Sequence, residues 1–253
     1  MKLYQIYFSP TGGTKKVIDM LGSAWETEKE MIDLFTLEGA SGYSFNEEDI
    51  CLVAVPAFGG RVPALATERI RKLEGNGAKA VPVAVYGNRD YDDTLLELKE
   101  TLESAGFCCI AGVAAIAEHS IFRQFASNRP DKADGEELRG FALQIQEAVR
   151  SGIQGTLTVK GNHPYKEAGS HLTPFADDTC VRCGLCAAQC PVKAIPAEDV
   201  RTADADKCIS CMHCIAVCPV HSRRNDEAVV SRVEQRLEPL CSGRKANELF
   251  LSR

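Results

Sequence analysis

Apolar and polar positions alternate in blocks over residues 1–152, and the blocks predict strands and helices in turn. Nearly continuous apolar runs, such as residues 49–58, are typical of strands buried on both faces of a parallel sheet. In residues 15–26 the apolar side chains fall at i, i+1, i+4 and i+8, which is helical spacing. The expected strands are 2–8, 30–35, 49–58, 79–87 and 107–118, and the expected helices are 15–26, 63–74, 91–105 and 135–150. The sequence therefore predicts an open α/β domain.

Pro82 argues for an edge position or an irregular start of its strand, because proline donates no ladder hydrogen bond.

The alternation of strands and helices stops after residue 152. Residues 153–178 are rich in Gly, His and Pro, and we expect them to form a linker. Cysteines dominate residues 179–225, which we expect to be a second, small domain. In the tail, residues 226–253, apolar side chains at i, i+4 and i+8 predict a helix. Such a helix can pack on either domain or on a second copy of the chain, so a homodimer stays open.

Eight of the twelve cysteines follow one spacing that occurs twice, C-x₂-C-x₂-C-x₃-C-P. It is the run of bacterial ferredoxins with two 4Fe–4S clusters, in which the fourth cysteine binds the other cluster. Structural zinc usually shows paired C-x-x-C units instead, and disulfides do not suit a chain without an export signal. We assign cluster I to Cys180, Cys183, Cys186 and Cys218, and cluster II to Cys208, Cys211, Cys214 and Cys190.

We do not expect the other four cysteines or His213 to be cluster ligands. Cys51, Cys108 and Cys109 lie in predicted core strands, where thiols behave as small apolar groups, and Cys241 in the tail has no evident partner. His213 lies inside the second cysteine run, where we expect it to be exposed.

A Ser/Thr/Gly-rich turn, residues 9–14, joins the first predicted strand to the first helix. Glycines there let the backbone turn sharply, and the free N–H groups at the helix start can bind an anion. The turn has neither the Lys of a Walker loop nor the G-x-G-x-x-G spacing of dinucleotide folds. It resembles the S/T-x-T-G-x-T phosphate loop of flavodoxins, and a capped helix start is the alternative. The resemblance implies FMN phosphate contacts at Ser9, Thr11, Gly12, Gly13 and Thr14.

Two further glycine-bearing loops follow the third and fourth predicted strands. In a sheet of order 2-1-3-4-5 a ligand lies beyond the carboxyl ends of strands 1, 3 and 4. We expect an aromatic ring, from Phe58 or Tyr91, against the isoalloxazine, and an arginine, Arg61 or Arg89, near its N1/O2 region. A solvated loop charge is the alternative for each arginine. The candidate flavin contacts are Pro56, Ala57, Phe58, Gly59, Gly60, Arg61, Gly87, Asn88, Arg89 and Tyr91.

Over essentially its whole length the chain resembles the family of flavodoxin-like proteins fused to a C-terminal ferredoxin domain with two 4Fe–4S clusters. That family occurs mostly in anaerobic bacteria and archaea. The segments that carry the resemblance are YFSPTGGT, VPAFGGRVP, VYGNRDYDDTLLEL, EHSIFRQFASNRPD and the two cysteine runs. It implies a flavodoxin-like, doubly wound sheet of five parallel strands in the order 2-1-3-4-5, with FMN bound. The second domain would be a small α+β ferredoxin-like fold.

The combination predicts an electron-transfer protein that relays electrons between the clusters and FMN and to partner redox proteins. Such partners would be ferredoxin- or flavodoxin-dependent oxidoreductases, and no catalytic side chain is required. An FMN-dependent reductase of an organic acceptor is the alternative, with His119, Arg123 or Tyr91 as the proton donor. A third hypothesis is a sensor in which the clusters report oxygen or iron.

Charge and hydropathy argue against some classes of partner and location. The formal net charge of −6 argues against a nucleic-acid partner. No apolar run reaches the 18 residues of a membrane span, and the N-terminus lacks the features of a signal peptide. We therefore expect a cytoplasmic protein without a membrane partner.

Two substitutions test the two-module interpretation. Anaerobically purified protein should contain about eight iron atoms and one FMN per chain. Cys214→Ala should remove or convert cluster II and leave FMN bound. Gly12→Val should do the reverse, because a side chain there blocks the approach of the backbone to the phosphate. Iron, sulfide and flavin quantitation measures both, and a single change that removes both cofactors would contradict the interpretation.

Overall fold

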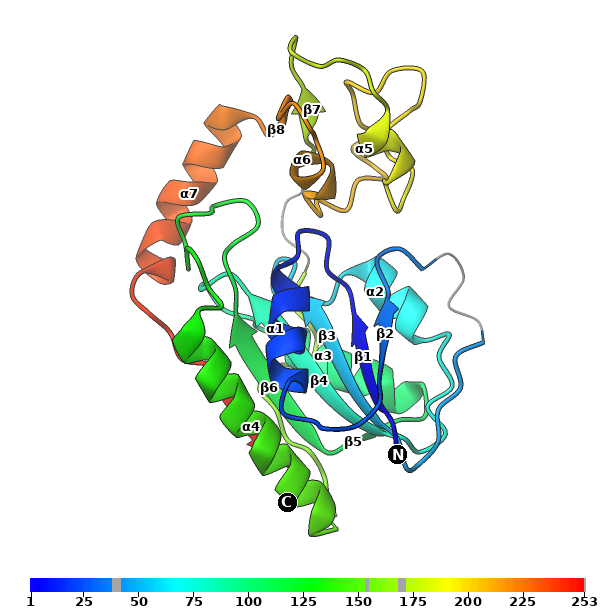
Figure 1. Ribbon diagram of the computed structural model, residues 1–253. Helices are drawn as coiled ribbons and strands as arrows, with labels where there is room; N and C mark the ends of the chain where they lie inside the picture. The colour runs from blue at the N-terminus through cyan, green and yellow to red at the C-terminus, as the bar shows by residue number, and fades with distance from the viewer. Residues whose placement is uncertain (38–41, 153–154, 168–171, 253) are drawn as a thin grey trace.

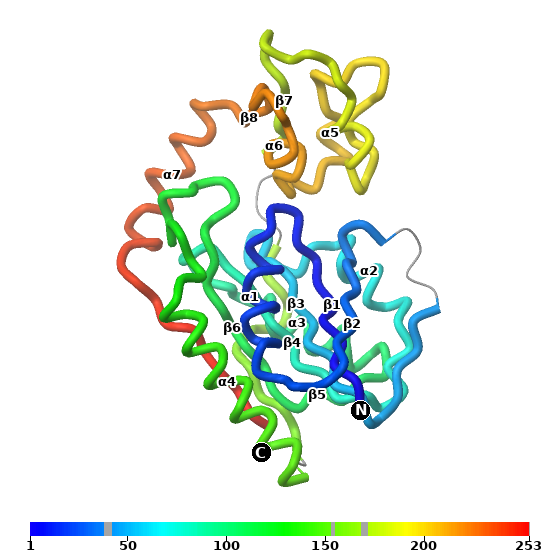
Figure 2. The backbone as a smooth tube through the Cα atoms, viewed as in Figure 1, coloured from blue at the N-terminus to red at the C-terminus, as the bar shows by residue number. Residues whose placement is uncertain are grey.

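The computed structural model describes residues 1–37, 42–152, 155–167 and 172–252. A larger α/β domain carries a small cysteine-rich lobe at one end of its sheet, and a long helix runs from the lobe back along the α/β domain (Figures 1 and 2). Both chain termini lie at the far end of the α/β domain, away from the lobe. None of the helices in these residues has both the length and the hydrophobicity that crossing a bilayer requires.

The central sheet has the order β2-β1-β3-β4-β6, and these strands are parallel. Its strands are β1 (Leu3–Tyr7), β2 (Lys29–Asp33), β3 (Ile50–Pro56), β4 (Lys79–Tyr86), and β5 (Cys108–Cys109) with β6 (Ala111–Ile116). The last two are halves of one fifth strand, since both pair with β4. This is the flavodoxin-like order, so the predicted fold class is confirmed.

Four helices cover the two faces of the sheet, as the predicted spacing requires. They are α1 (Gly13–Gly22), α2 (Ala64–Ile70), α3 (Thr94–Ser104) and α4 (Lys132–Arg150). Apolar side chains of α1 and α4 share one buried cluster with one face of the sheet, and those of α2 and α3 share another with the opposite face. The carboxyl ends of β1, β3 and β4 therefore meet at one edge, where the three glycine-bearing loops begin.

Pro82 lies in β4, a central strand, so the expectation of an edge position is wrong. Its missing N–H falls where the fifth strand is interrupted: β5 ends at Cys109, β6 begins at Ala111, and the register with β4 shifts by one residue between them. Ile110 donates to the carbonyl of Ala80 at 3.0 Å, so residue 82 would be the next ladder donor, to the Ile110 carbonyl. That carbonyl instead accepts from the backbone N–H and the hydroxyl of Ser252, at 3.1 and 2.9 Å. The C-terminus thus satisfies an acceptor that the proline leaves open.

The C-terminal tail differs from the expected helix. Helix α7 (Glu227–Cys241) is followed by a strand, β9 (Glu248–Leu251), which pairs antiparallel with β6 and extends the sheet. Phe250 and Leu249 face the two buried clusters of the α/β domain. The structure therefore adds an antiparallel strand to the predicted five-stranded parallel sheet, and the chain returns to its first domain after the cysteine lobe.

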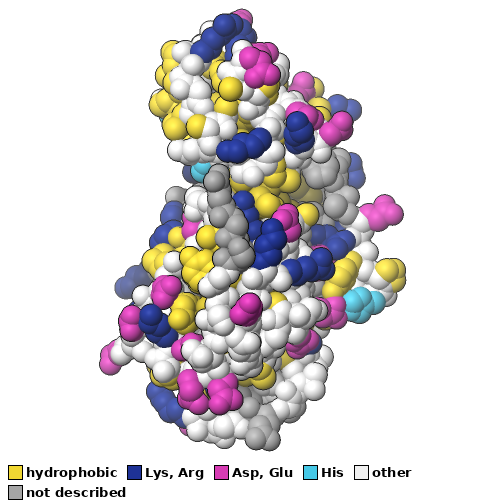
Figure 3. Space-filling model, turned by 90° about the vertical axis from the view of Figure 1, so that its right-hand side faces the viewer, with side chains coloured by type: hydrophobic (Ala, Val, Ile, Leu, Met, Phe, Trp, Pro, Cys, Tyr) yellow, Lys and Arg dark blue, Asp and Glu magenta, His cyan; other side chains and the backbone are white. Residues whose placement is uncertain are grey.

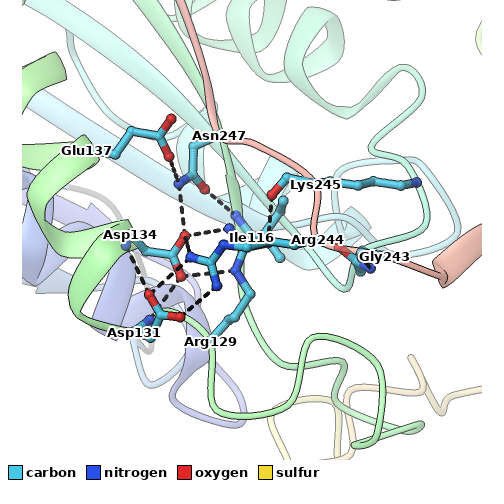
Figure 4. A network of polar contacts seen from close by, with 10 residues as sticks. Ile116, Arg129, Asp131, Asp134, Glu137, Gly243, Arg244, Lys245 and Asn247 are labelled. Carbon is cyan, nitrogen blue, oxygen red and sulfur yellow. Dashed lines mark hydrogen bonds and ion pairs between the residues drawn. The ribbon is translucent and has the colours of Figure 1, made fainter.

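A cluster of buried charges anchors this returning segment, as Figure 4 shows. Arg129, 7% exposed, forms an ion pair with the fully buried Asp134 and donates to the carbonyl of Lys245 at 2.8 Å. Arg244 pairs with Asp131 at 2.6 Å, and Asn247 donates to Asp134 at 3.1 Å. Burial alone would raise the pKa of Asp134, but these partners lower it below its usual value.

The segment expected to be a linker also packs on the α/β domain in part. Leu157 is buried in the core, and the backbone N–H groups of Asn162 and Lys166 donate to Asp93 at 2.9 and 2.7 Å. The rest of the expected linker includes residues 153–154 and 168–171, which lie outside the described residues. The chain is thus fastened to the α/β domain shortly before it enters the cysteine lobe.

The cysteine lobe contains little regular structure. A two-stranded ladder of β7 (Phe175–Ala176) and β8 (Arg223–Arg224) closes its ends, and two single-turn helices, α5 (Leu185–Ala188) and α6 (His213–Ala216), lie inside the cysteine runs.

The buried pair predicts a large difference between two arginine substitutions. Arg129→Met should lower the free energy of unfolding by about 3–5 kcal/mol, because it leaves the Asp134 charge buried without its main partner. Arg123→Met is the matched control, since Arg123 pairs with Glu118 while its side chain is 79% exposed; it should cost less than about 1 kcal/mol. Anaerobic unfolding followed by circular dichroism measures both, and equal effects would contradict the anchoring role.

Candidate functional site

The eight cysteines of the two runs surround two separate cavities in the lobe. Cys190, Cys208, Cys211 and Cys214 line one, and Cys180, Cys183, Cys186 and Cys218 line the other. Each cavity thus takes three cysteines from one run and the fourth from the other run, which is the grouping that the spacing predicts. The crossing arises because the last cysteine of each run follows the single-turn helix and points back towards the partner run.

Each cavity has room for a group larger than one ion. The cavities enclose about 380 and 300 Å³, part of it open to solvent. Among the described residues, no three His, Cys, Asp or Glu side chains lie close enough together to hold a single metal ion. A tetrahedral zinc would need sulfurs about 2.3 Å from one centre. The donor set, four thiols around each open space, suits a cuboidal iron–sulfur cluster.

The two cysteine runs share an unusual backbone conformation. At three pairs of equivalent positions the φ angle is positive: 54° at both Arg182 and Ser210, 77° at Gly184 and 59° at Met212, and 51° at Lys193 and 52° at His221. Non-glycine residues rarely adopt this conformation, so its recurrence indicates that both loops wrap their cavities in the same way. The internal repeat seen in the sequence is therefore a repeat of structure as well.

Burial and hydrogen bonding shift the pKa values of three of the cysteine thiols. It raises the pKa of the Cys211 thiol to about 12 and that of Cys214 to about 11, and neighbouring cysteines add to the effect. At Cys218 burial acts in the same direction, but the Ser222 hydroxyl and backbone N–H groups bring the pKa down to about 7. Burial therefore disfavours the thiolates of Cys211 and Cys214 unless a cationic group lies among the thiols, as iron supplies.

The turn of residues 9–14 lies at the carboxyl edge of the sheet and starts α1. Gly12 has a φ of 89°, which favours glycine, and the Ser9 hydroxyl accepts the N–H of Lys15 at 2.9 Å. The backbone N–H groups of residues 11–14 have no acceptor among the described residues. A Cβ on Gly12 would meet nothing within 4 Å, so the loop leaves open space in front of these donors. Free donors at a helix start fit an anion such as a phosphate.

The loop after β3 is a tight hairpin. Phe58 and Arg61 exchange backbone hydrogen bonds, and Gly59 and Gly60 occupy the turn with positive φ. Phe58 stays half-buried and Gly59 exposed, so both remain available to a ligand. Arg61 does not, because its guanidinium makes two hydrogen bonds to Glu97 at 2.8 Å and lies 4.8 Å from the Tyr165 ring. The Arg61 guanidinium is thus already paired within the protein, and its place near the flavin N1/O2 region stays a prediction.

Three residues of the loop after β4 likewise have side chains that contact other parts of the protein. Tyr91 is only 2% exposed and contacts Tyr86 and Glu248 inside the core, so it cannot lie against an isoalloxazine as expected. The Asn88 amide donates to the carbonyls of Cys241 and Gly243, at 2.6 and 2.8 Å, and holds the end of α7. Arg89 forms an ion pair with Asp92. The sequence placed these residues in the correct loop but could not show that the C-terminal segment occupies them.

Four further residues of these loops offer backbone groups or close packing rather than free side chains. They are Pro56, Ala57, Gly60 and Gly87. Ala57 donates to the Val85 carbonyl at 2.8 Å, which ties the two loops together. A Cβ on Gly60 would lie 2.1 Å from Asp92, and one on Gly87 would lie 2.5 Å from His119, so both glycines are required for close packing.

The candidate proton donors of a reductase do not suit that role. Burial, with a smaller effect of Arg89, lowers the pKa of His119 to about 4, and its Nδ1 accepts backbone N–H groups of Ile121 and Phe122. Burial raises the pKa of the Tyr91 hydroxyl, and the Arg123 side chain pairs with Glu118 in solvent. Neither His119 nor Tyr91 is an acid that releases a proton near neutral pH.

His213 connects the two domains, which the sequence analysis missed. Its Nδ1 donates to the carbonyl of Pro10, in the turn of residues 9–14, at 2.7 Å, and its ring centroid lies 4.6 Å from that of Phe35. Its Nε2 lies 3.0 Å from Oε1 of Gln189, in the first cysteine run. A comparison of the two runs could have found it. The position equivalent to His213 in the first run is Leu185, so the cysteine repeat itself does not call for a histidine there.

The remaining cysteines follow the expectation in part. Cys51 and Cys109 are buried, whereas Cys108 is exposed because it points away from the core on the short strand β5. Cys241, the last residue of α7, is buried together with Phe122 and Phe125, so the tail cysteine has apolar packing partners.

Comparison with known proteins identifies the family of the cysteine lobe and finds several similar solved structures. The 4Fe-4S dicluster domain family matches residues 179–222, so the lobe is a dicluster domain. A flavodoxin from Streptococcus pneumoniae TIGR4 is 18% identical and covers 58% of this chain and 99% of its own, with a TM-score of 0.43. A flavodoxin from the domain Archaea is 17% identical over 59% of this chain and 99% of its own, with a TM-score of 0.44. A flavone reductase is 13% identical over 64% and 66%, with a TM-score of 0.43. No curated protein matches the chain in sequence.

The environment of His119 gives a prediction about its protonation. We expect its imidazole to stay neutral, with the proton on Nε2, from about pH 5.5 to 8. In the unfolded chain it takes up a proton as the pH falls through about 6.5. Its contribution to stability is therefore complete above that value and declines as the pH falls towards the folded value of about 4. Nitrogen-15 NMR, with His119→Asn for assignment, measures the tautomer, and a signal that titrates near the ordinary histidine value would contradict it.

Proposed function

We propose that this protein is an electron relay in which FMN, bound at the carboxyl edge of the α/β sheet, exchanges electrons with the clusters and with partner redox proteins. The observation that carries the proposal is the contact of His213 with Pro10. It joins the loop around the cluster II cavity directly to the turn whose free N–H groups suit a phosphate. FMN, when bound, accepts two electrons and releases them singly, whereas each cluster carries one.

The residues that would hold FMN are fewer than the sequence suggested. The free backbone donors of residues 11–14 would bind the phosphate, with Ser9 holding the turn in shape. Phe58 and Gly59 would contact the ring system. Figure 3 shows hydrophobic side chains at the waist between the two parts of the molecule, with lysines and arginines beside them. Such a surface suits a flat aromatic group that carries an anionic tail.

The two clusters would have different places in the relay. Cys211 and Ile209 pack against the buried cluster of the α/β domain, so cluster II is the inner one. The cluster I cavity faces outwards, with Cys183 exposed and Val181 62% exposed. Electrons would pass between a partner protein and cluster I, then between cluster I and cluster II, and then between cluster II and the flavin, one at a time in either direction.

A reductase of an organic acceptor is the less favoured function. It needs a proton donor near the flavin, and His119, Arg123 and Tyr91 are all committed to other contacts. The relay requires only that the cofactors lie close to each other, which the contact of His213 with Pro10 supports.

Substitution of the bridging histidine tests the relay. His213→Leu introduces the residue that the equivalent turn of the first run already contains, Leu185, so cluster II should still assemble. After pulsed photoreduction, electron exchange between clusters and flavin should slow by up to about tenfold, since one hydrogen bond between the domains is lost. Amide hydrogen exchange at residues 11–14 should accelerate in the same variant.

The matched control is His221→Asn, which changes an exposed histidine of the same lobe at a position of positive φ that asparagine tolerates. It should leave both measurements unchanged. Unaltered electron exchange in His213→Leu with full cofactor loading, or equal slowing in both variants, would contradict the proposed route through this contact.

A further inference from the structure

Arg223 is a buried cation without an anionic side chain beside it. It is 2% exposed, and its guanidinium donates to the backbone carbonyls of Pro174 at 2.7 Å, Val200 at 2.7 Å and Thr202 at 2.9 Å. Its Nε is buried and has no hydrogen-bond partner, and it forms no ion pair with any described carboxylate. Arg224, the next residue, is half-exposed and pairs with Asp177 and Glu227 in the usual way.

Such an arrangement is costly unless negative charge lies nearby. Removing a guanidinium from water costs several kcal/mol, and three neutral carbonyls compensate this only in part. Buried charges in proteins are therefore normally paired with a counter-charge or a metal centre. The protein side chains around Arg223 supply none, so the counter-charge has to come from another group in the lobe.

Both cluster cavities are close to Arg223. It lines the cavity of cluster I, and its backbone N–H donates to the sulfur of Cys218, a predicted ligand of that cluster. On the side of cluster II, its guanidinium donates to the carbonyl of Pro174, a residue that lines that cavity. One side chain thus reaches the electrostatic surroundings of both clusters, in a buried setting where charges are screened weakly.

We infer that Arg223 is the internal counter-ion of the two clusters and raises their reduction potentials. A 4Fe–4S cluster with four thiolates carries a net charge of −2 when oxidised and −3 after taking up one electron. A fixed cation beside the cluster stabilises the more negative, reduced form more than the oxidised form. The other charged side chains of the described part of the lobe are half-buried or exposed, so Arg223 is the charge that solvent screens least.

A purely structural role is the competing explanation. The three carbonyls that accept from Arg223 belong to Pro174, directly before β7, and to the loop between the runs, so the guanidinium also ties these segments together. The two roles make different predictions for a lysine, which keeps the charge but cannot reproduce the planar set of hydrogen bonds.

The test is a redox titration of the complete, cluster-loaded chain with dithionite and mediators, followed by the spectra of the reduced clusters. Arg223→Gln, which removes the charge and keeps an N–H donor, should shift the reduction equilibrium of both clusters by about tenfold or more towards the oxidised form, equal to about 59 mV for one electron. Arg223→Lys should stay near the native potentials. Arg224→Gln, the same change at the neighbouring exposed site, should have a much smaller effect.

The outcomes separate the two roles even when a variant assembles poorly. If Arg223→Gln loses its iron while Arg223→Lys retains about eight atoms per chain, the charge itself is required and the inference holds. Equal shifts in the lysine and glutamine variants, loss of iron from both, or native potentials in Arg223→Gln would each overturn it. The titration follows the clusters alone and the inference requires no bound flavin, so this result stands apart from the test of the relay.

Discussion

The arrangement of the whole molecule depends on the attachment of the cysteine lobe at both of its ends. Before the lobe, Leu157 and the bonds to Asp93 fix the chain on the α/β domain; after it, β9 pairs with β6 and the Arg129–Asp134 pair secures the segment around Lys245. Ser252 then satisfies the Ile110 carbonyl, which Pro82 leaves without a donor. A domain held at two points has far less freedom than one on a single linker, so the two attachments restrict the lobe to positions near the carboxyl edge of the sheet.

This fixed position explains the proposed function in physical terms. A flavodoxin-like sheet brings its ligand loops to one edge, and the lobe faces that edge with the second cysteine run, through His213. Burial opposes the thiolates of Cys211 and Cys214, so iron and a buried cation such as Arg223 together make the charge of the clusters tolerable. The same charges that allow the lobe to fold around its clusters therefore also set how readily those clusters accept an electron.

Much of this could be predicted from the sequence, because the decisive signals are local. Apolar runs between helical spacings gave the parallel sheet, and the doubled cysteine run gave the grouping of thiols that surrounds each cavity. The failures involve contacts between distant parts of the chain. Tyr91 and Asn88 lie in the expected loop but face the returning C-terminal segment, and Pro82 is accepted in a central strand because Ser252 compensates. No local pattern shows that His213 reaches Pro10 or that Arg223 lacks a carboxylate.

The most direct test of the account is an anaerobic crystal structure of the loaded protein with anomalous scattering from iron. The account predicts a four-iron cube in each cavity, with the cube held by Cys190, Cys208, Cys211 and Cys214 nearer to residues 9–14 and to a bound FMN phosphate. A single metal ion in each cavity, or a lobe displaced so that the other cube lies nearer to this turn, would contradict it.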